Sequence, residues 1–292
     1  MLQTSKKRRI ALVIAERSQK FNSDASFARS IGISPAQLSR IKKGEINRVI
    51  SDENYLRIAN ELDIDLRGFD WKTAETPTFK KIYKQLEVCQ TQSISAVLVD
   101  EAGVGKTHTA KEYAKRNTNA VYVDCSQVKS KQLLVRSIAK KFGLNYKGRY
   151  ADVYKGLVFY LNTSDAPPLI ILDEAGDLQY PAFLELKALW NATEGLCAFY
   201  MMGADGLKAK IERNINNEKV GYTEIFRRFG GRFQKVSPQG KEAVEQFNKE
   251  QLATVAKANE MKDIRQLYSK TSGSLTRLKI EYLKSKRSKA TA

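Results

Sequence analysis

The sequence predicts an α/β protein whose central parallel sheet lies between two all-helical regions. Between about residues 79 and 236, short apolar runs of the buried-strand type alternate with amphipathic helical patterns. Residues 1–66 and residues 237–292 carry helical patterns without a strand signal, and the last helices end in a basic tail. Residues 67–78 are rich in Thr, Gly and Pro, which indicates a linker between the first helical region and the sheet.

Within the first region, Ser26–Gly44 has the pattern of a helix-turn-helix. Gly32 permits a tight turn between two short helices, and Ser34 caps the second helix with Pro35 in its first position. The pattern resembles the DNA-binding fold of phage repressors, although a helical bundle that docks another protein is an alternative. The polar residues available to DNA on the second helix are Gln37, Ser39, Arg40, Lys42 and Lys43.

The middle region supplies the strands and helices of the predicted sheet. Its expected strands are Ile94–Val99, Ala120–Asp124, Leu169–Leu172, Leu196–Met202 and Arg232–Val236. Its expected helices are Thr107–Arg116, Lys131–Phe142, Asp152–Leu161 and Pro181–Thr193.

A glycine-rich loop joins the first predicted strand to the first predicted helix of this region. Such a loop lets backbone N–H groups converge on phosphate oxygens, and the helix amino terminus adds a partial positive charge. Lys106 is expected to reach the β- and γ-phosphates of ATP, and the Thr107 hydroxyl to bind Mg²⁺. The nucleotide-binding candidates of this loop are Gly103, Val104, Gly105, Lys106, Thr107 and His108.

One position departs from the usual phosphate-loop pattern. The pattern has a glycine five residues before Gly105, where this chain has Asp100. A carboxylate at this position would place a negative charge near the phosphates, so we expect weaker nucleotide binding.

Two acids follow the third predicted strand. At the tip of that strand, Asp173 can hold the Mg²⁺ shell, and Glu174 can orient and deprotonate an attacking water. With the glycine-rich loop, this pair predicts ATP hydrolysis as well as ATP binding.

Charge and composition narrow the partners. With 50 Lys and Arg against 32 Asp and Glu, the net charge is +18, which favours a polyanionic partner such as duplex DNA. No apolar run approaches a membrane span and no signal-peptide core follows the amino terminus, so we expect a cytoplasmic protein without a membrane partner. Three scattered cysteines and one histidine argue against a disulfide framework and against zinc sites built from paired cysteines or several histidines.

The two motifs together resemble the AAA+ branch of P-loop ATPases. In that family a polar residue after the fourth strand contacts the γ-phosphate. In this chain that residue is either replaced by Ala204 or displaced by one position to Asp205. The resemblance further implies an arginine finger at Arg227 or Arg228 that acts on the site of a neighbouring subunit. It also implies a lid arginine, Arg277, that reaches the nucleotide.

The order of helix-turn-helix, linker, AAA+ core and short basic helical end resembles the MuB-like ATPases of phage Mu transposition and, more distantly, IstB-type ATPases. This resemblance implies ATP-dependent homo-oligomers, as a helical filament or ring, on duplex DNA with little sequence specificity. It also implies recruitment and stimulation of a transposase. Candidate DNA contacts in the core are Lys129, Lys131, Lys147 and Arg149, although each could be a solvated surface charge.

Two other functions remain open at this stage. A replication-type helicase loader is also a basic AAA+ ATPase, but its amino-terminal segment usually differs from a helix-turn-helix. A transcription regulator would use the helix-turn-helix to read an operator and would treat nucleotide as a ligand. The interpretation we favour is an assembly-dependent switch: a slow ATPase as a monomer that duplex DNA and oligomerisation stimulate.

Overall fold

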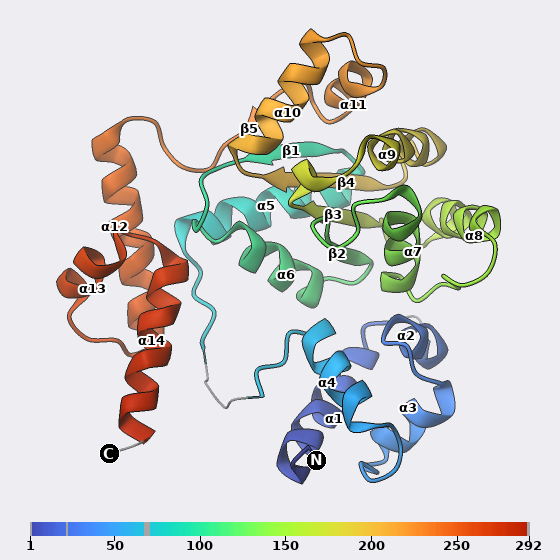
Figure 1. Ribbon diagram of the computed structural model, residues 1–292, viewed down its shortest axis with the longest axis horizontal. Coiled ribbons are helices and arrows are strands. Elements are labelled where there is room, and N and C mark those ends of the chain that lie inside the picture. The colour runs from blue at the N-terminus through green and yellow to red at the C-terminus, as the bar shows by residue number, and fades with distance from the viewer. Residues whose placement is uncertain (1, 22, 67–70, 291–292) are drawn as a thin grey trace.

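The computed structural model describes residues 2–21, 23–66 and 71–290, which form an amino-terminal helical domain, an α/β core and a carboxy-terminal group of helices that we call the lid, after its predicted role (Figure 1). The helices of the amino-terminal domain are α1 (Thr4–Ser18), α2 (Asp24–Ser30), α3 (Pro35–Lys42) and α4 (Asp52–Glu61). The helices of the lid are α12 (Lys241–Ala258), α13 (Ile264–Thr271) and α14 (Leu275–Ala290). In the described residues, no helix is long and apolar enough to cross a membrane.

The core is built on a parallel sheet. Its strands are β1 (Ala96–Val99), β2 (Ala120–Asp124), β3 (Leu169–Asp173), β4 (Ala198–Gly203) and β5 (Phe233–Gln234), in the order β2-β3-β4-β1-β5. All four pairings are parallel. The predicted strands are therefore found, with ends that differ by at most two residues.

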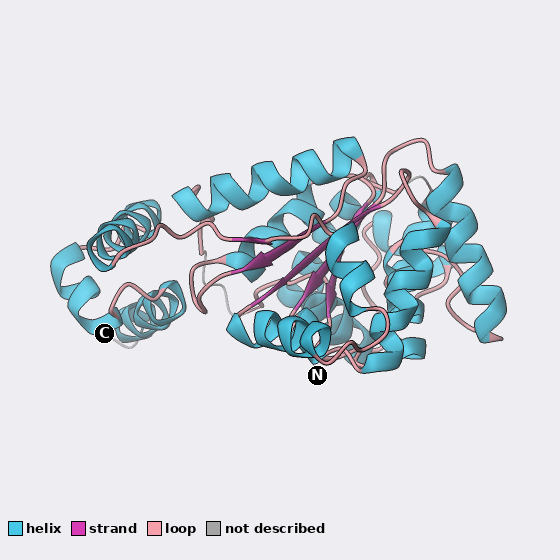
Figure 2. Cartoon of the chain, turned by 90° about the horizontal axis from the view of Figure 1, so that it is seen from above, coloured by secondary structure: helices cyan, strands magenta, loops and turns pink. Residues whose placement is uncertain are grey.

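Helices cover both faces of this sheet (Figure 2). Neighbouring residues of a strand point to opposite faces, so each strand packs against helices on both sides. Ala96 and Leu98 pack with α5 (Pro77–Gln92) and α6 (Lys106–Arg116) on one face. Val97 and Val99 share the core on the other face with residues of the remaining helices. These are α7 (Lys131–Lys141), α8 (Tyr150–Thr163), α9 (Tyr180–Ala192), α10 (Asp205–Asn216) and α11 (Tyr222–Arg228), with a 3-10 turn, η1 (Ala175–Asp177).

The predicted linker, residues 67–78, overlaps the core. Residues 67–70 lie outside the described residues. Helix α5 begins at Pro77, with the Thr76 side chain accepting a hydrogen bond from the backbone N–H of Phe79, so the core starts two residues earlier than predicted. Between them, the ring of Trp71 packs edge-on against Tyr282 of the lid at 5.2 Å, and the amide of Asn259 bonds both backbone groups of Lys72.

The amino-terminal domain has its own core, and two short helices, α2 and α3, joined by a turn occupy the stretch predicted as a helix-turn-helix. Gly32 has a φ of +67° at the turn between α2 and α3. Ser34 and Gln37 form a reciprocal capping box at the start of α3, and Leu38 and Ile41 face inward. The exposed side of α3 is therefore free of apolar packing within this domain.

Candidate nucleotide site

The glycine-rich loop lies at the carboxyl end of β1 and runs into the amino terminus of α6. Gly103 and Gly105 have φ values of +83° and +104°, a region that favours glycine because other side chains are strained there. A Cβ on Gly103 would lie 3.1 Å from Ser274 Oγ of the lid, and one on Gly105 would lie 3.6 Å from Leu275. The lid segment that precedes Arg277 is thus packed directly on the loop.

Lys106 is buried in this loop, with 7% of its surface exposed. Its Nζ donates to the carbonyl oxygens of Asp100 at 2.6 Å and Glu101 at 2.7 Å. Burial lowers the pKa of Lys106, and the nearby charges of Asp100 and Asp173 oppose that shift. An ammonium group has three protons, so one remains for a phosphate oxygen.

The two candidate magnesium ligands meet at the end of β3. The Thr107 hydroxyl donates to Asp173 Oδ2 at 2.7 Å, although 66 residues separate them in the chain. The Tyr122 hydroxyl donates to the same oxygen at 2.9 Å, and the acid is buried. A hydroxyl and a carboxylate fit Mg²⁺, which prefers oxygen and usually takes few ligands from the protein.

Tyr122 was not predicted as a site residue. Tyr122 lies in β2, which pairs with β3. Two residues after Tyr122, Asp124 lies opposite Asp173, so this end of β2 lies beside the acid. The signal in the sequence was one aromatic residue within an apolar run, which gives no hint of its partner.

Glu174 sits beside this pair in an unusual backbone conformation. Its φ is +49°, and its N–H donates to Asp173 Oδ1 at 3.0 Å. Partial burial raises the pKa of the Glu174 carboxyl, and the charge of Asp173 raises it further. The Glu174 carboxylate, next to Asp173 in the chain, is suited to accept a proton from water.

The Asp100 carboxylate, which was expected to weaken nucleotide binding, is held by hydrogen bonds to the protein. Its carboxylate is buried, with 1% of the residue exposed, and accepts hydrogen bonds from the backbone N–H groups of Val236 and Ser237 at 2.8 and 2.9 Å. The Ser237 hydroxyl and the Glu101 N–H also donate to it. Burial acts to raise the pKa of Asp100, but these hydrogen bonds outweigh it and the pKa is lowered. Asp100 therefore ties the phosphate loop to the segment that leads from β5 to the lid.

We expect Asp100→Gly to destabilise the core by about 3 kcal/mol, because several hydrogen bonds to one buried charge are lost. This change installs the glycine of the usual phosphate-loop pattern, so the pattern alone would predict an improved site instead of a less stable core. Thermal unfolding and titration with a non-hydrolysable ATP analogue would measure stability and binding. Glu101→Ala, at the exposed neighbouring acid, is the matched control. A stability of Asp100→Gly equal to that of the control would contradict this role.

The remaining candidates from the loop and the two sensors make no hydrogen bond to Asp173 or Glu174 in the described residues. His108 Nε2 lies 3.1 Å from Thr73 Oγ1, so its side chain faces the segment before the core. Burial lowers the pKa of His108. Ala204 precedes α10, and Asp205 is exposed in the first turn of that helix. Arg277 is exposed in the first turn of α14.

The structure distinguishes the two finger candidates on α11. Arg227 is exposed. The guanidinium of Arg228 lies over the Trp190 ring at 4.8 Å, and its buried Nη1 has no hydrogen-bond partner among the described residues. Arg228 is thus packed within its own subunit, whereas Arg227 is available to another molecule.

The DNA candidates on α3 also differ in availability. The Gln37 amide is used inside the domain: its oxygen accepts from the Ser34 N–H and its nitrogen donates to the Val49 carbonyl. Arg40 pairs with Glu45 and Lys42 with Asp24, each at 2.7 Å, on an exposed surface where such pairs are weak. Ser39 and Lys43 are exposed.

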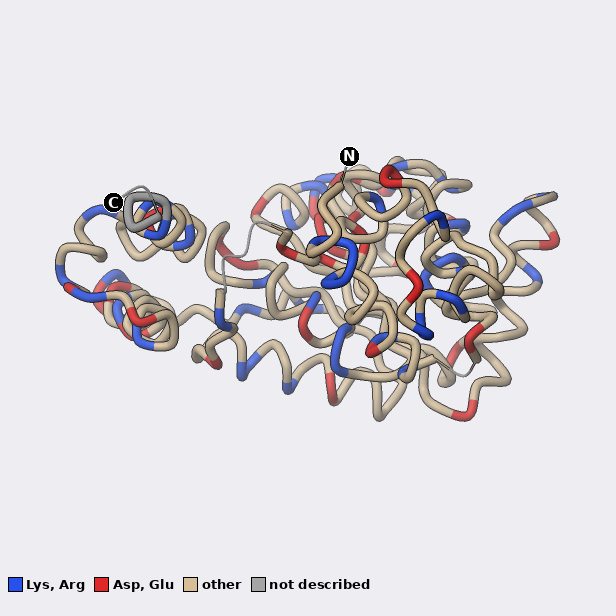
Figure 3. Tube along the Cα trace, turned by 90° about the horizontal axis from the view of Figure 1, so that it is seen from below, with Lys and Arg blue, Asp and Glu red and all other residues tan. Residues whose placement is uncertain are grey.

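The four DNA-contact candidates of the core also divide into residues held in ion pairs and residues that are exposed. Lys129 pairs with Asp177 at 3.5 Å, and Lys131 with Glu185 at 3.6 Å. Lys147 and Arg149 are exposed, and no described carboxylate is within ion-pair distance of either. Across the chain, Lys and Arg occur in all three parts with acidic residues interspersed (Figure 3).

Three comparisons relate this chain to known proteins. Residues 89–211 match the family model described as "AAA domain". The chain is 27% identical over 198 residues to "Mu-like prophage FluMu DNA transposition protein B" of Haemophilus influenzae, a match that covers 66% of this chain and 68% of that protein. It is also similar to the ORC1 protein of Aeropyrum pernix, solved in complex with DNA, at 16% identity and a TM-score of 0.46. That match covers 67% of this chain and about half, 51%, of the ORC1 chain.

Proposed function

We propose a function for this chain from two premises: its core is an AAA domain, as the sequence predicted, and the chain is similar to the transposition protein B of a Mu-like prophage. The proposed protein is an ATPase that assembles on duplex DNA with little sequence specificity and recruits and stimulates a transposase. The observation that carries the ATPase assignment is the 2.7 Å contact between Thr107 and Asp173, because it joins the two halves of the site.

In this proposal the residues of one subunit bind ATP and prepare water. The backbone of the glycine-rich loop and Lys106 hold the phosphates, and Thr107 and Asp173 hold Mg²⁺, which would neutralise charge on the phosphates. Glu174 orients the attacking water and accepts its proton. Arg227 of a neighbouring subunit completes the site, so hydrolysis depends on assembly.

Duplex DNA is the proposed polyanion. The net charge of +18 supports phosphate contacts, which carry affinity without sequence information. The exposed side of α3 supports a contribution from the helix-turn-helix. The transposase as a partner rests on the similarity to transposition protein B alone.

Electron microscopy of the protein with a long non-specific duplex and ATP tests the assembly. We expect continuous filaments or stacked rings with ATP and their disappearance as ATP is consumed. Protein without nucleotide is the control. Discrete particles without filaments or stacked rings would overturn the proposed function; the same particles at a single position on a duplex that carries an operator would identify a transcription regulator.

A further inference from the structure

The amino-terminal domain is seated on the AAA core, in contact with the carboxyl end of α7 (Figure 1). We call this contact the docking seam; it consists of Ser26, Arg29 and Glu61 from the domain and Lys140, Phe142 and Gly143 from the core. A helix carboxyl end leaves carbonyl oxygens without helical partners and carries a partial negative charge. The domain supplies donors to that end. The Ser26 hydroxyl donates to the Phe142 carbonyl at 3.2 Å, and Arg29 Nε donates to the Gly143 carbonyl at 2.7 Å.

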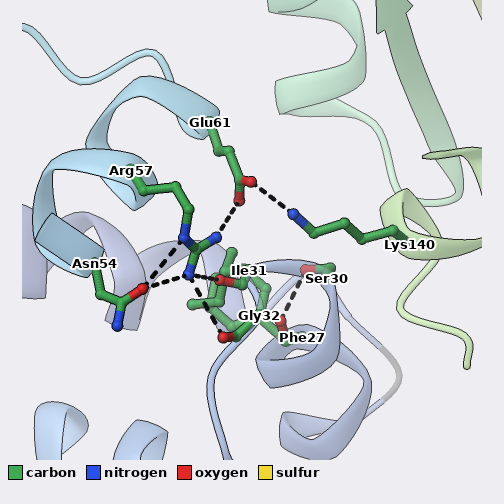
Figure 4. A network of polar contacts seen from close by, with 8 residues as sticks. All are labelled: Phe27, Ser30, Ile31, Gly32, Asn54, Arg57, Glu61 and Lys140. Carbon is green, nitrogen blue, oxygen red and sulfur yellow. Dashed lines mark hydrogen bonds and ion pairs between the residues drawn. The ribbon is translucent and has the colours of Figure 1, made fainter. Parts of the chain in front are cut away.

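An ion-pair chain joins the seam to the turn of the helix-turn-helix (Figure 4). Lys140 Nζ lies 2.6 Å from Glu61, and Glu61 lies 3.2 Å from the guanidinium of Arg57. Arg57 in turn donates to the Ile31 carbonyl at 2.9 Å, immediately before Gly32. The exposed fractions of the Arg57, Glu61 and Lys140 side chains are 34%, 26% and 23%, so these pairs are less screened by solvent than fully exposed surface pairs. The turn that positions α3 is therefore connected to the core.

Gly143 makes this close approach possible. Its φ is +73°, and a Cβ on it would lie 2.2 Å from Ser26 Oγ and 2.3 Å from the Ser26 carbonyl oxygen. The second of these is a backbone atom that cannot swing away. The nearby Gly148 has a similar φ of +88°, but a Cβ on it would meet nothing within 4 Å.

A basic loop begins at the seam. Residues 144–149 follow Gly143, and Arg136 of α7 braces the loop by donating to the carbonyls of Tyr146 at 2.7 Å and Gly148 at 2.9 Å. This loop presents Lys147 and Arg149 to solvent. It is thus fixed at its start by α2 and in its middle by α7.

We infer that the docked helix-turn-helix and the 144–149 loop form one composite surface for duplex DNA. In a helix-turn-helix the first helix crosses the DNA backbone while the second enters the major groove. Here α2 is the first helix and is seated on Gly143, the residue immediately before the basic loop, so Lys147 and Arg149 are positioned to contact the phosphates of the same duplex. The inference rests on the proposed function, specifically on duplex binding.

Docking is tested first, with Gly143→Ala and its matched control Gly148→Ala. Both changes strain a left-handed backbone, but only the first meets Ser26. Spin labels at cysteines introduced for the exposed Asn47 and Glu194 would report the distance between domain and core, since the three native cysteines are buried. We expect one narrow distance distribution for the wild type and Gly148→Ala, and a broad one for Gly143→Ala. A narrow distribution in both variants would overturn the seam.

DNA binding is then measured by anisotropy of a labelled non-specific duplex across a range of salt concentrations. In the wild type, replacing Lys147 and Arg149 with Ala should weaken binding about tenfold and lower the salt slope by about 1 to 2. In the Gly143→Ala background the same replacement should have little further effect, because the loop no longer shares the duplex with α3. Equal effects in both backgrounds would overturn the composite surface. A wild-type protein that binds no duplex would instead overturn the proposed function.

A second route keeps the test informative if Gly143→Ala does not fold. Glu61→Lys and Lys140→Glu should each broaden the label distances, and the double exchange should narrow them again. Charge alone predicts that Glu61→Lys binds DNA more tightly, whereas the composite surface predicts weaker binding. Tighter binding by Glu61→Lys, with its label distances broadened, would contradict the inference.

Discussion

Replacing Glu174 with Gln is expected to lower the kcat of ATP hydrolysis by about 100- to 10,000-fold, the usual contribution of a general base. The amide keeps the size of the side chain and can still touch a water, but it cannot accept a proton. Glu174 makes a backbone contact to Asp173 through its N–H, which the substitution leaves in place. ATP should therefore bind normally, and DNA complexes should persist instead of dissolving.

Single-turnover hydrolysis and ATP-analogue titration separate these two effects. Asp177→Asn is the matched control, because Asp177 is an exposed acid three residues further on whose partner is Lys129. The raised pKa of Glu174 adds a second readout. The base works only when deprotonated, so kcat should fall with decreasing pH through a pKa above that of an ordinary Glu, and Glu174→Gln should lose this limb. A kcat within tenfold of wild type in Glu174→Gln would remove Glu174 from the chemistry.

The central sheet and the acid pair were predictable because their signals are local. An apolar run such as Leu169–Leu172 bounded by turns fixes a buried strand, and two acids at its end fix where a metal can bind. Helix α5 was not assigned, although Thr76 and Pro77 are ordinary start signals. They lie in a stretch whose Thr and Pro content also fits a linker, and composition cannot separate the two.

Long-range partners explain most of what the sequence did not reveal. Asp100 was expected to oppose phosphate, yet its partners Val236 and Ser237 lie 136 and 137 residues away. Gln37 was expected on the DNA side of α3, but its amide closes a capping box and bonds Val49. Arg227 and Arg228 are adjacent and equivalent in sequence, and only the packing of Trp190 distinguishes them. Of these contacts, only the capping box of Ser34 and Gln37 follows a local sequence pattern.

The arginine assignment predicts the second large effect. Arg227→Ala should lower kcat by about 1,000-fold in the assembled protein, which is within the range of an arginine finger supplied by a neighbour. Arg228→Ala is the matched control on the same helix. It removes a side chain stacked on Trp190, so we expect a lower melting temperature and a kcat within tenfold of wild type. Hydrolysis rates measured on duplex DNA, where subunits are in contact, would compare the two.

Mixing two inactive variants distinguishes a finger acting on a neighbour from an arginine acting within its own subunit. Lys106→Ala lacks the phosphate lysine but keeps Arg227, and Arg227→Ala has the opposite defect. If the interface is head-to-tail, an equimolar mixture contains intact sites at roughly a quarter of its interfaces, so activity should return to about that fraction of wild type. An arginine that serves its own subunit gives no recovery, because neither chain has both groups. Recovery on DNA, with none for either variant alone, therefore requires that Arg227 act across the interface, which makes hydrolysis a property of the assembly and not of the monomer.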